Sequence, residues 1–135
     1  MTTSLPTSGI YFDLSPIFAD LNQRYFNEKI SAHLRWGIKR THNGARKKSI
    51  RLGSYHPGKK LITINPCLDQ ACVPLICVER ILFHEMVHQR FPARRSSTGK
   101  VLVHYREFNE FEKNYPHLCL ADHWIKTNLN RLLKF

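Results

Sequence analysis

Hydrophobic residues in the first part of the chain recur every three or four positions. They are Ile17, Phe18, Leu21 and Tyr25. This spacing is typical of an amphipathic helix, and the Ser15-Pro16 pair before it has the residue types of a helix start. The pattern therefore predicts a helix over residues 16–28.

The pattern then changes to the alternation that is typical of half-buried strands. Over residues 34–39, apolar side chains alternate with polar ones or glycine. Residues 50–52 and 61–64 show shorter apolar patterns, and a turn is predicted between them at Tyr55-His56-Pro57-Gly58. Together these segments predict a small three-stranded antiparallel sheet.

A nearly continuous apolar run over residues 75–87 predicts a helix that is buried on almost every side. Pro74 can open this helix, because proline is tolerated in the first helical turn. The helix should end near Phe91, because Pro92 disfavours helical geometry in the residue before it.

The remaining sequence predicts a polar basic loop over residues 93–100 and helices over residues 101–114 and 121–134. The fold class that follows is α+β, with an N-terminal helix, a small sheet, a central helix and further C-terminal helices. The length of 135 residues fits one domain with a single core.

The central helix carries the strongest candidate for chemistry, the pattern His84-Glu85-Met86-Val87-His88. Residues four apart lie on one face of a helix, so both imidazoles can bind a single ion with Glu85 beside them. In this arrangement two histidines hold Zn²⁺ and the glutamate acts as a general base. A metal also removes the cost of burying these polar groups in an apolar helix. The alternative interpretation is a metal-free cluster of hydrogen-bonded His, Glu and His.

A catalytic zinc usually takes three protein ligands, so a third ligand must come from elsewhere in the chain. His104 is the predicted third ligand, since a short loop separates it from the central helix and can fold it back. Glu107 and Glu110 are the alternatives. The more distant His117, Cys119 and His123 match no closed four-ligand spacing and are expected to be structural or exposed.

The net charge is +11, from 21 Lys and Arg residues against 10 Asp and Glu residues. A positive field of this size favours polyanionic partners, and the basic residues cluster in predicted loops or at strand edges. Nucleic-acid contacts are therefore expected from Arg46, Lys47, Lys48, Arg94, Arg95 and Lys100.

The 4 cysteines have no C-x-x-C spacing, which indicates reduced thiols. The first residues show no export signal, and no apolar run has the length of a membrane span. These observations predict a cytoplasmic protein without a membrane partner, with association with the nucleoid or location in the nucleus as alternatives.

Several short motifs of this chain occur in the order in which they occur in a family of zinc peptidases. The motifs cover residues 21–27, 35–37, 52–55, 62–66, 82–88 and 104–108. Over residues 14–115 the chain resembles the SprT-like metalloproteases, the group that includes the Spartan DNA–protein crosslink proteases. The resemblance implies a core over residues 14–115, with an N-terminal extension over residues 1–13 and a helical segment over residues 116–135 packed on that core. The resemblance implies a zincin-like minimal core in which His84, His88 and His104 bind one Zn²⁺ per chain and Glu85 is catalytic.

The resemblance also implies a zinc-dependent endopeptidase whose protein substrates are associated with DNA or crosslinked to it. Two departures are visible: Tyr105 follows the third histidine where the family commonly has Gly, and the chain lacks the paired C-x-x-C motifs of a zinc ribbon. The alternative function is a nucleic-acid-binding protein with a structural or vestigial zinc site. The group that stabilises the oxyanion stays open among Tyr105, Arg106, Tyr115 and His56.

Overall fold

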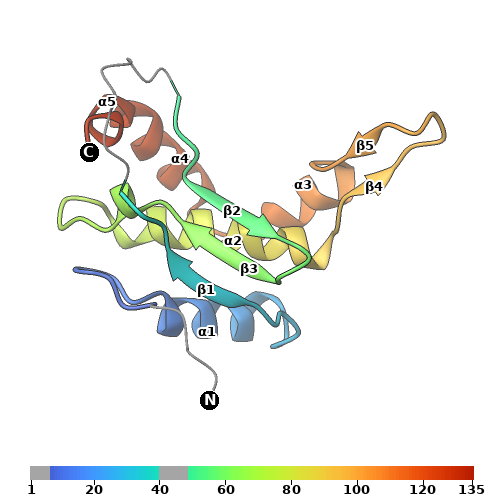
Figure 1. Cartoon of the computed structure of the whole chain (residues 1–135), viewed down its shortest axis with the longest axis horizontal. Helices are drawn as coiled ribbons and strands as arrows, with labels where there is room; N and C mark the ends of the chain where they lie inside the picture. Colours follow the sequence, from blue (N-terminus) through green and yellow to red (C-terminus); the bar gives the residue numbers. More distant parts are fainter. Residues whose placement is uncertain (1–6, 40–48) are drawn as a thin grey trace.

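A computed structural model describes residues 7–39 and 49–135, and it confirms the α+β class. Within these residues there are five α-helices, a mixed three-stranded sheet, and a separate two-stranded hairpin that projects from the rest of the molecule (Figure 1). The helices are α1 (Leu14–Tyr25), α2 (Leu75–Arg90), α3 (Arg106–Glu112), α4 (Leu118–Thr127) and α5 (Leu129–Leu133). The strands are β1 (His33–Trp36), β2 (Gly53–His56), β3 (Leu61–Ile64), β4 (Arg94–Arg95) and β5 (Val101–Leu102), and a short 3-10 helix spans Pro66–Leu68. None of the described helices is both long enough and apolar enough to cross a membrane.

The prediction of an all-antiparallel sheet is wrong for β1. The strand order is β1-β3-β2, in which β2 and β3 form an antiparallel hairpin but β1 pairs with β3 in parallel. Alternation along a strand predicts which face is buried, but it carries no information about the partner or its direction. Residues 37–52 separate β1 from β2, and such a long connection lets β1 join the far edge of β3.

The strand predicted near residues 50–52 begins later, at Gly53, and includes Tyr55 and His56, which the sequence had suggested to lie in a turn. The turn covers residues 57–60, where the backbone N–H of Lys60 donates to the carbonyl of Pro57 at 3.2 Å. The residue types predicted a turn correctly, but the turn lies two residues later in the chain than predicted.

The helix boundaries also differ from the predicted ones. The side chain of Asp13 caps α1 by accepting from the backbone of Ser15 at 3.1 Å, and the helix ends at Tyr25 before two residues with positive φ, Asn27 and Glu28. The loop expected over residues 93–100 instead supplies β4, which pairs with β5, so that α3 starts only at residue 106. The final helix is interrupted at Asn128, whose side chain donates to the carbonyl of Trp124 at 2.9 Å.

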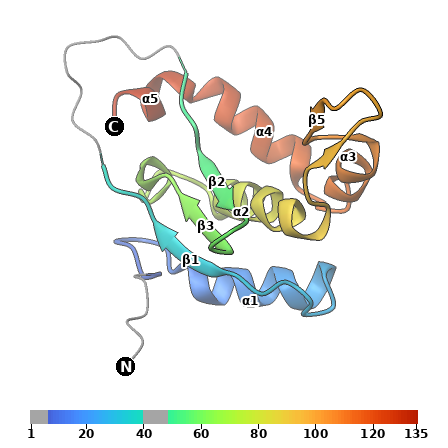
Figure 2. The ribbon, with the colours of Figure 1, turned by 45° about the vertical axis from the view of Figure 1, so that its right-hand side comes forward.

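Helix α2 occupies the centre of the molecule, as its nearly all-apolar sequence predicts. It contacts α1 and the sheet on one side and α3 and α4 on the other (Figures 1 and 2). Its side chains Cys77, Val78, Leu82, Phe83, Met86 and Val87 are fully buried. Such burial fixes α2 on several sides, and four polar residues of its second half, His84, Glu85, His88 and Gln89, line one cleft.

Candidate metal centre

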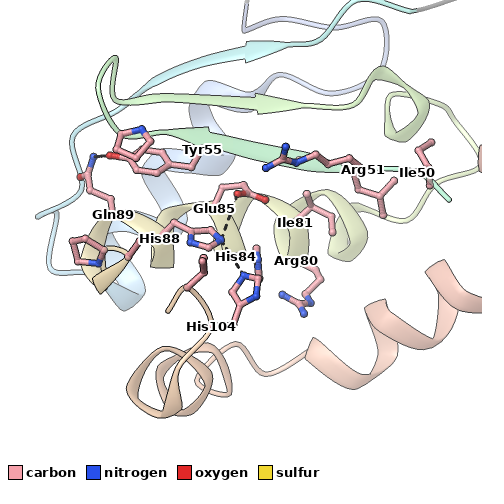
Figure 3. Close-up of a pocket in the computed structure, with 16 residues that line it drawn as sticks. Ile50, Arg51, Tyr55, Arg80, Ile81, His84, Glu85, His88, Gln89 and His104 are labelled. Atoms are coloured by element: carbon pink, nitrogen blue, oxygen red, sulfur yellow. Dashed lines mark hydrogen bonds and ion pairs between the residues drawn. The ribbon is translucent and has the colours of Figure 1, made fainter. Parts of the chain in front are cut away.

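Three imidazoles converge at one end of the central helix (Figure 3). His84 and His88 extend from α2, and His104 comes from the segment between β5 and α3. Their ligand nitrogens all lie within 4.8 Å of one another, and the Nε2 atoms of His88 and His104 are 3.2 Å apart. Two nitrogens on one tetrahedral zinc, at ~2.0–2.1 Å from the metal, are separated by roughly 3.3 Å. The three histidines are therefore close enough to bind one metal ion, and the donor set suits zinc.

A carboxylate orients the first of these imidazoles from behind. Glu112, at the end of α3, contacts Nδ1 of His84, which leaves Nε2 of that ring for a metal. The same carboxylate accepts from Arg80 at 2.8 Å, and Arg80 also donates to Asp122 at 2.8 Å. Burial alone would raise the pKa of Glu112, but the hydrogen bond from His84 and the charge of Arg80 lower it to about 2. Histidines that bind metals commonly have such a carboxylate partner.

An aromatic ring supports all three histidines. Phe108 on α3 is completely buried, and its ring centroid lies 5.2, 4.7 and 4.9 Å from those of His84, His88 and His104. Burial, together with the neighbouring His84 and His104, lowers the pKa of His88 to about 4. His88 is thus neutral at physiological pH, which is the form that binds a metal.

Glu85 lies beside the imidazoles and is buried, with 5% of its surface exposed. Its Oε1 is 4.0 Å from Nε2 of His88. Burial raises the pKa of this carboxyl to about 7. Gly53 of β2 makes the close packing possible, because a Cβ at this position would lie 2.7 Å from Ile81 and 3.0 Å from the Glu85 carboxylate. A carboxyl with a pKa near 7 can both accept and release a proton at neutral pH.

The site opens into a cleft of about 610 Å³. Strand β2 and the residues before it form one wall, and Pro92, Ala93, Val103 and His104 form the other. Arg51, Tyr55, Arg80 and Gln89 also line the cleft (Figure 3), and the sequence alone did not single them out as site residues. The Tyr55 hydroxyl accepts from Gln89 of α2 at 3.1 Å. If the sequence-based prediction had placed Tyr55 in a strand instead of a turn, alternation would have put it on the buried face with Ile62.

The alternative third ligands and the oxyanion candidates lie elsewhere. Glu107 pairs with Arg94 at 3.1 Å, and Glu110 pairs with Arg106 at 3.0 Å. The hydroxyl of Tyr105 donates to Pro92, that of Tyr115 donates to Glu79, and His56 accepts from the backbone of Lys59. Among the described residues that line the cleft, none of the four oxyanion candidates occurs. His117, Cys119 and His123 form no metal-binding group within the described part of the chain.

The predicted nucleic-acid contacts fall in two places. Arg46, Lys47 and Lys48 lie outside the described residues. Arg94, Arg95 and Lys100 lie on the exposed β4–β5 hairpin, which projects beside α3 (Figure 1). The guanidinium of Arg94 stacks on the ring of Tyr105 at 3.9 Å besides pairing with Glu107, and Arg95 donates to the carbonyl of Gly99 at 3.0 Å.

No protein-family model matches this chain, and comparisons with curated proteins and with solved structures give no significant match. A functional assignment therefore depends on the chemistry of the cleft and on the motifs of the sequence.

Proposed function

We propose that this chain is a zinc-dependent endopeptidase of the SprT-like type, with a zincin-like core, which acts on DNA-associated or DNA-crosslinked proteins. The observation that carries the proposal is the convergence of three imidazoles beside a buried glutamate in an open cleft. His84, His88 and His104 would hold the zinc. The motif order of the sequence supports the family, and the net charge of +11 supports a DNA partner.

Each group of the cleft has a distinct role in this proposal. Zinc held by these three histidines would supply a Lewis acid, which would lower the pKa of a water molecule to about 7 and polarise a carbonyl. Glu85 would accept a proton from the attacking water and pass it to the leaving amine, as a general base and then a general acid. Tyr55 is a cleft-lining hydroxyl that could donate to a substrate carbonyl, whereas none of the four candidates named from the sequence lines the cleft.

The open cleft favours catalysis over a structural zinc. Structural zinc sites are closed by four protein ligands, whereas catalytic sites keep one position free. Within the described residues, the converging group contains three ligands, and a cavity of about 610 Å³ adjoins them. The second candidate function, a nucleic-acid-binding protein with a structural or vestigial zinc site, is supported by the charge of the chain.

The substitution Glu85→Gln tests the proposal. The variant should keep about one zinc per chain, because the glutamate is not a ligand, and it should lose cleavage of a protein bound to DNA. Metal analysis and a cleavage assay with Glu110→Gln as a control measure both properties, since Glu110 is an exposed carboxylate paired with Arg106. Equal cleavage by wild type and Glu85→Gln would contradict the proposed mechanism.

Two further outcomes separate the alternatives. Zinc in the wild-type protein without cleavage on any DNA cofactor would favour the nucleic-acid-binding alternative. A protein that holds no zinc after preparation with excess metal would contradict both functions and favour the metal-free cluster.

A further inference from the structure

The three-stranded sheet has one face turned away from the central helix. Leu34, Ile62 and Ile64 are buried beneath the sheet, where α1 and α2 contact it. Because side chains alternate along a strand, Arg35, Thr63 and Ser54 point to the opposite face. The strand register places these three residues in one row, since Arg35 and Ser54 are both partners of Thr63. Nε of Arg35 donates to the Thr63 hydroxyl at 3.0 Å.

A hollow of about 350 Å³ is lined by all three residues of this row. Its polar lining includes Arg35, Arg51, Ser54, Thr63 and Asn65. The side-chain amide of Asn65 donates to the carbonyl of Arg51 at 3.1 Å and so fixes the backbone that carries this arginine. Arg51 also lines the metal cleft, and the hollow and the cleft therefore adjoin each other.

The sheet region has no acidic residue in its sequence. Between Glu28 and Asp69 the chain contains no Asp or Glu. The same stretch contains Lys29, Arg35, Lys39, Arg40, Arg46, Lys47, Lys48, Arg51, Lys59 and Lys60. Neither Arg35 nor Arg51 takes part in an ion pair with another described residue.

The hairpin differs from this region, because Glu107 offsets the charge of Arg94. Arg35 and Arg51 thus lie in a hollow whose described lining contains no carboxylate, although the charge of Arg51 also acts on Glu85 of the metal cleft. Two unpaired guanidinium groups beside neutral hydroxyls form a donor set for phosphate oxygens.

We propose that this hollow binds a phosphate of a nucleic-acid backbone, with Arg35 and Arg51 as charged donors and the hydroxyls of Ser54 and Thr63 as neutral ones. The nucleic-acid strand then runs along the outer face of the sheet, and Arg51 links it to the metal cleft. A protein attached to that strand would lie beside the peptidase site. The inference rests on the proposed function for the nature of the polyanion, but the binding site itself does not require catalysis.

The test is binding of fluorescent single-stranded and double-stranded oligonucleotides, measured by anisotropy over a range of salt concentrations. The variant Arg35→Gln/Arg51→Gln should bind roughly tenfold more weakly, and its salt dependence should fall by about one to two released ions. Lys113→Gln/Lys126→Gln removes the same charge from exposed positions on the far side of α2 and should bind nearly as wild type does. Arg95→Gln/Lys100→Gln removes the same charge from the hairpin and should also retain most of the affinity.

Arg35→Lys separates charge from fold. This variant keeps a cation at the row and should bind more tightly than the single variant Arg35→Gln, which is measured beside it. If the Arg35→Gln/Arg51→Gln variant loses no more affinity than the Lys113→Gln/Lys126→Gln control, the hollow is not the binding site. A larger loss for the hairpin variant would place the nucleic acid on β4–β5 instead, and binding of anionic lipid vesicles without binding of oligonucleotides would overturn the proposal.

Zinc content and cleavage of DNA-bound protein are measured on the wild-type chain alone. A chain that binds DNA through Arg35 and Arg51 but cleaves nothing would contradict the peptidase and leave this site standing. A chain that cleaves but binds DNA independently of these arginines would contradict the site and leave the peptidase standing.

Discussion

Helix α3 makes one arginine–glutamate pair at the metal centre and another at the β4–β5 hairpin. Arg80 and Glu112 approach to 2.8 Å, and Arg94 and Glu107 approach to 3.1 Å. The side chains of the first pair are each 13% exposed, whereas those of the second are 52% and 51% exposed. Two interactions of the same chemistry therefore have different consequences, because water competes with the exposed pair and much less with the buried one.

The buried pair belongs to a network and the exposed pair does not. Arg80 joins Glu112 on α3 to Asp122 on α4, and Glu112 contacts His84. The network thus connects three helices directly behind the imidazoles. The side chain of Arg94, in contrast, makes two contacts that connect the hairpin to α3: an ion pair with Glu107 and stacking on the Tyr105 ring. The metal centre is therefore held by a connected network, whereas Arg94 attaches the hairpin to α3 through exposed contacts.

The largest effect on stability is expected from Arg80→Ala. Loss of this guanidinium leaves Glu112 partly buried without its cation, and we expect a decrease of about 2–3 kcal/mol in the free energy of unfolding. Urea unfolding of the metal-free protein measures it without a contribution from zinc binding. Arg94→Ala is the matched control and should cost less than about 1 kcal/mol. Equal losses in the two variants would contradict the difference between the two regions.

A somewhat smaller effect is expected on zinc affinity. Glu112→Ala removes the partner of His84 Nδ1, and loss of such a partner typically weakens metal binding about 10–100-fold. Glu112→Gln should lose less, because its amide oxygen still accepts a hydrogen bond. Competition with a chromophoric chelator measures the affinity, and Glu107→Ala on the same helix serves as the control. If Glu107→Ala weakened zinc binding as much as Glu112→Ala, α3 would act through its fold rather than through the carboxylate.

Local patterns in the sequence predicted the parts of the site that lie close together along the chain. The apolar run over residues 75–87 indicated a buried helix, and the spacing of His84 and His88 placed both on one face. The structure brings His104 to these two residues, as the short loop had suggested. In each case the decisive information is contained in a few neighbouring positions.

The remaining features depend on residues that are distant in sequence. The parallel pairing of β1 and the register of β2 result from tertiary contacts that alternation cannot reveal. The ion pair of Arg80 with Glu112 joins two helices, so its two members could not be matched from the sequence. The sequence did indicate that Arg80 needs a partner. Arg80 is a charged residue inside a buried apolar run, and a buried charge requires a partner.

The smallest effect is expected for the exposed pair itself. A double-mutant cycle with Arg94→Ala and Glu107→Ala should give a coupling free energy of about 0.2–1 kcal/mol, because both side chains are solvated. Part of the stability that Arg94→Ala loses will come from the lost stacking on Tyr105. This part is the same with and without Glu107, so it cancels in the coupling free energy. The coupling should decrease further at high salt, since exposed charges are screened. Thermal or urea unfolding at two salt concentrations measures it. A coupling of about 2 kcal/mol that is insensitive to salt would mean that the hairpin is held as firmly as the metal centre, because only a desolvated pair behaves in this way.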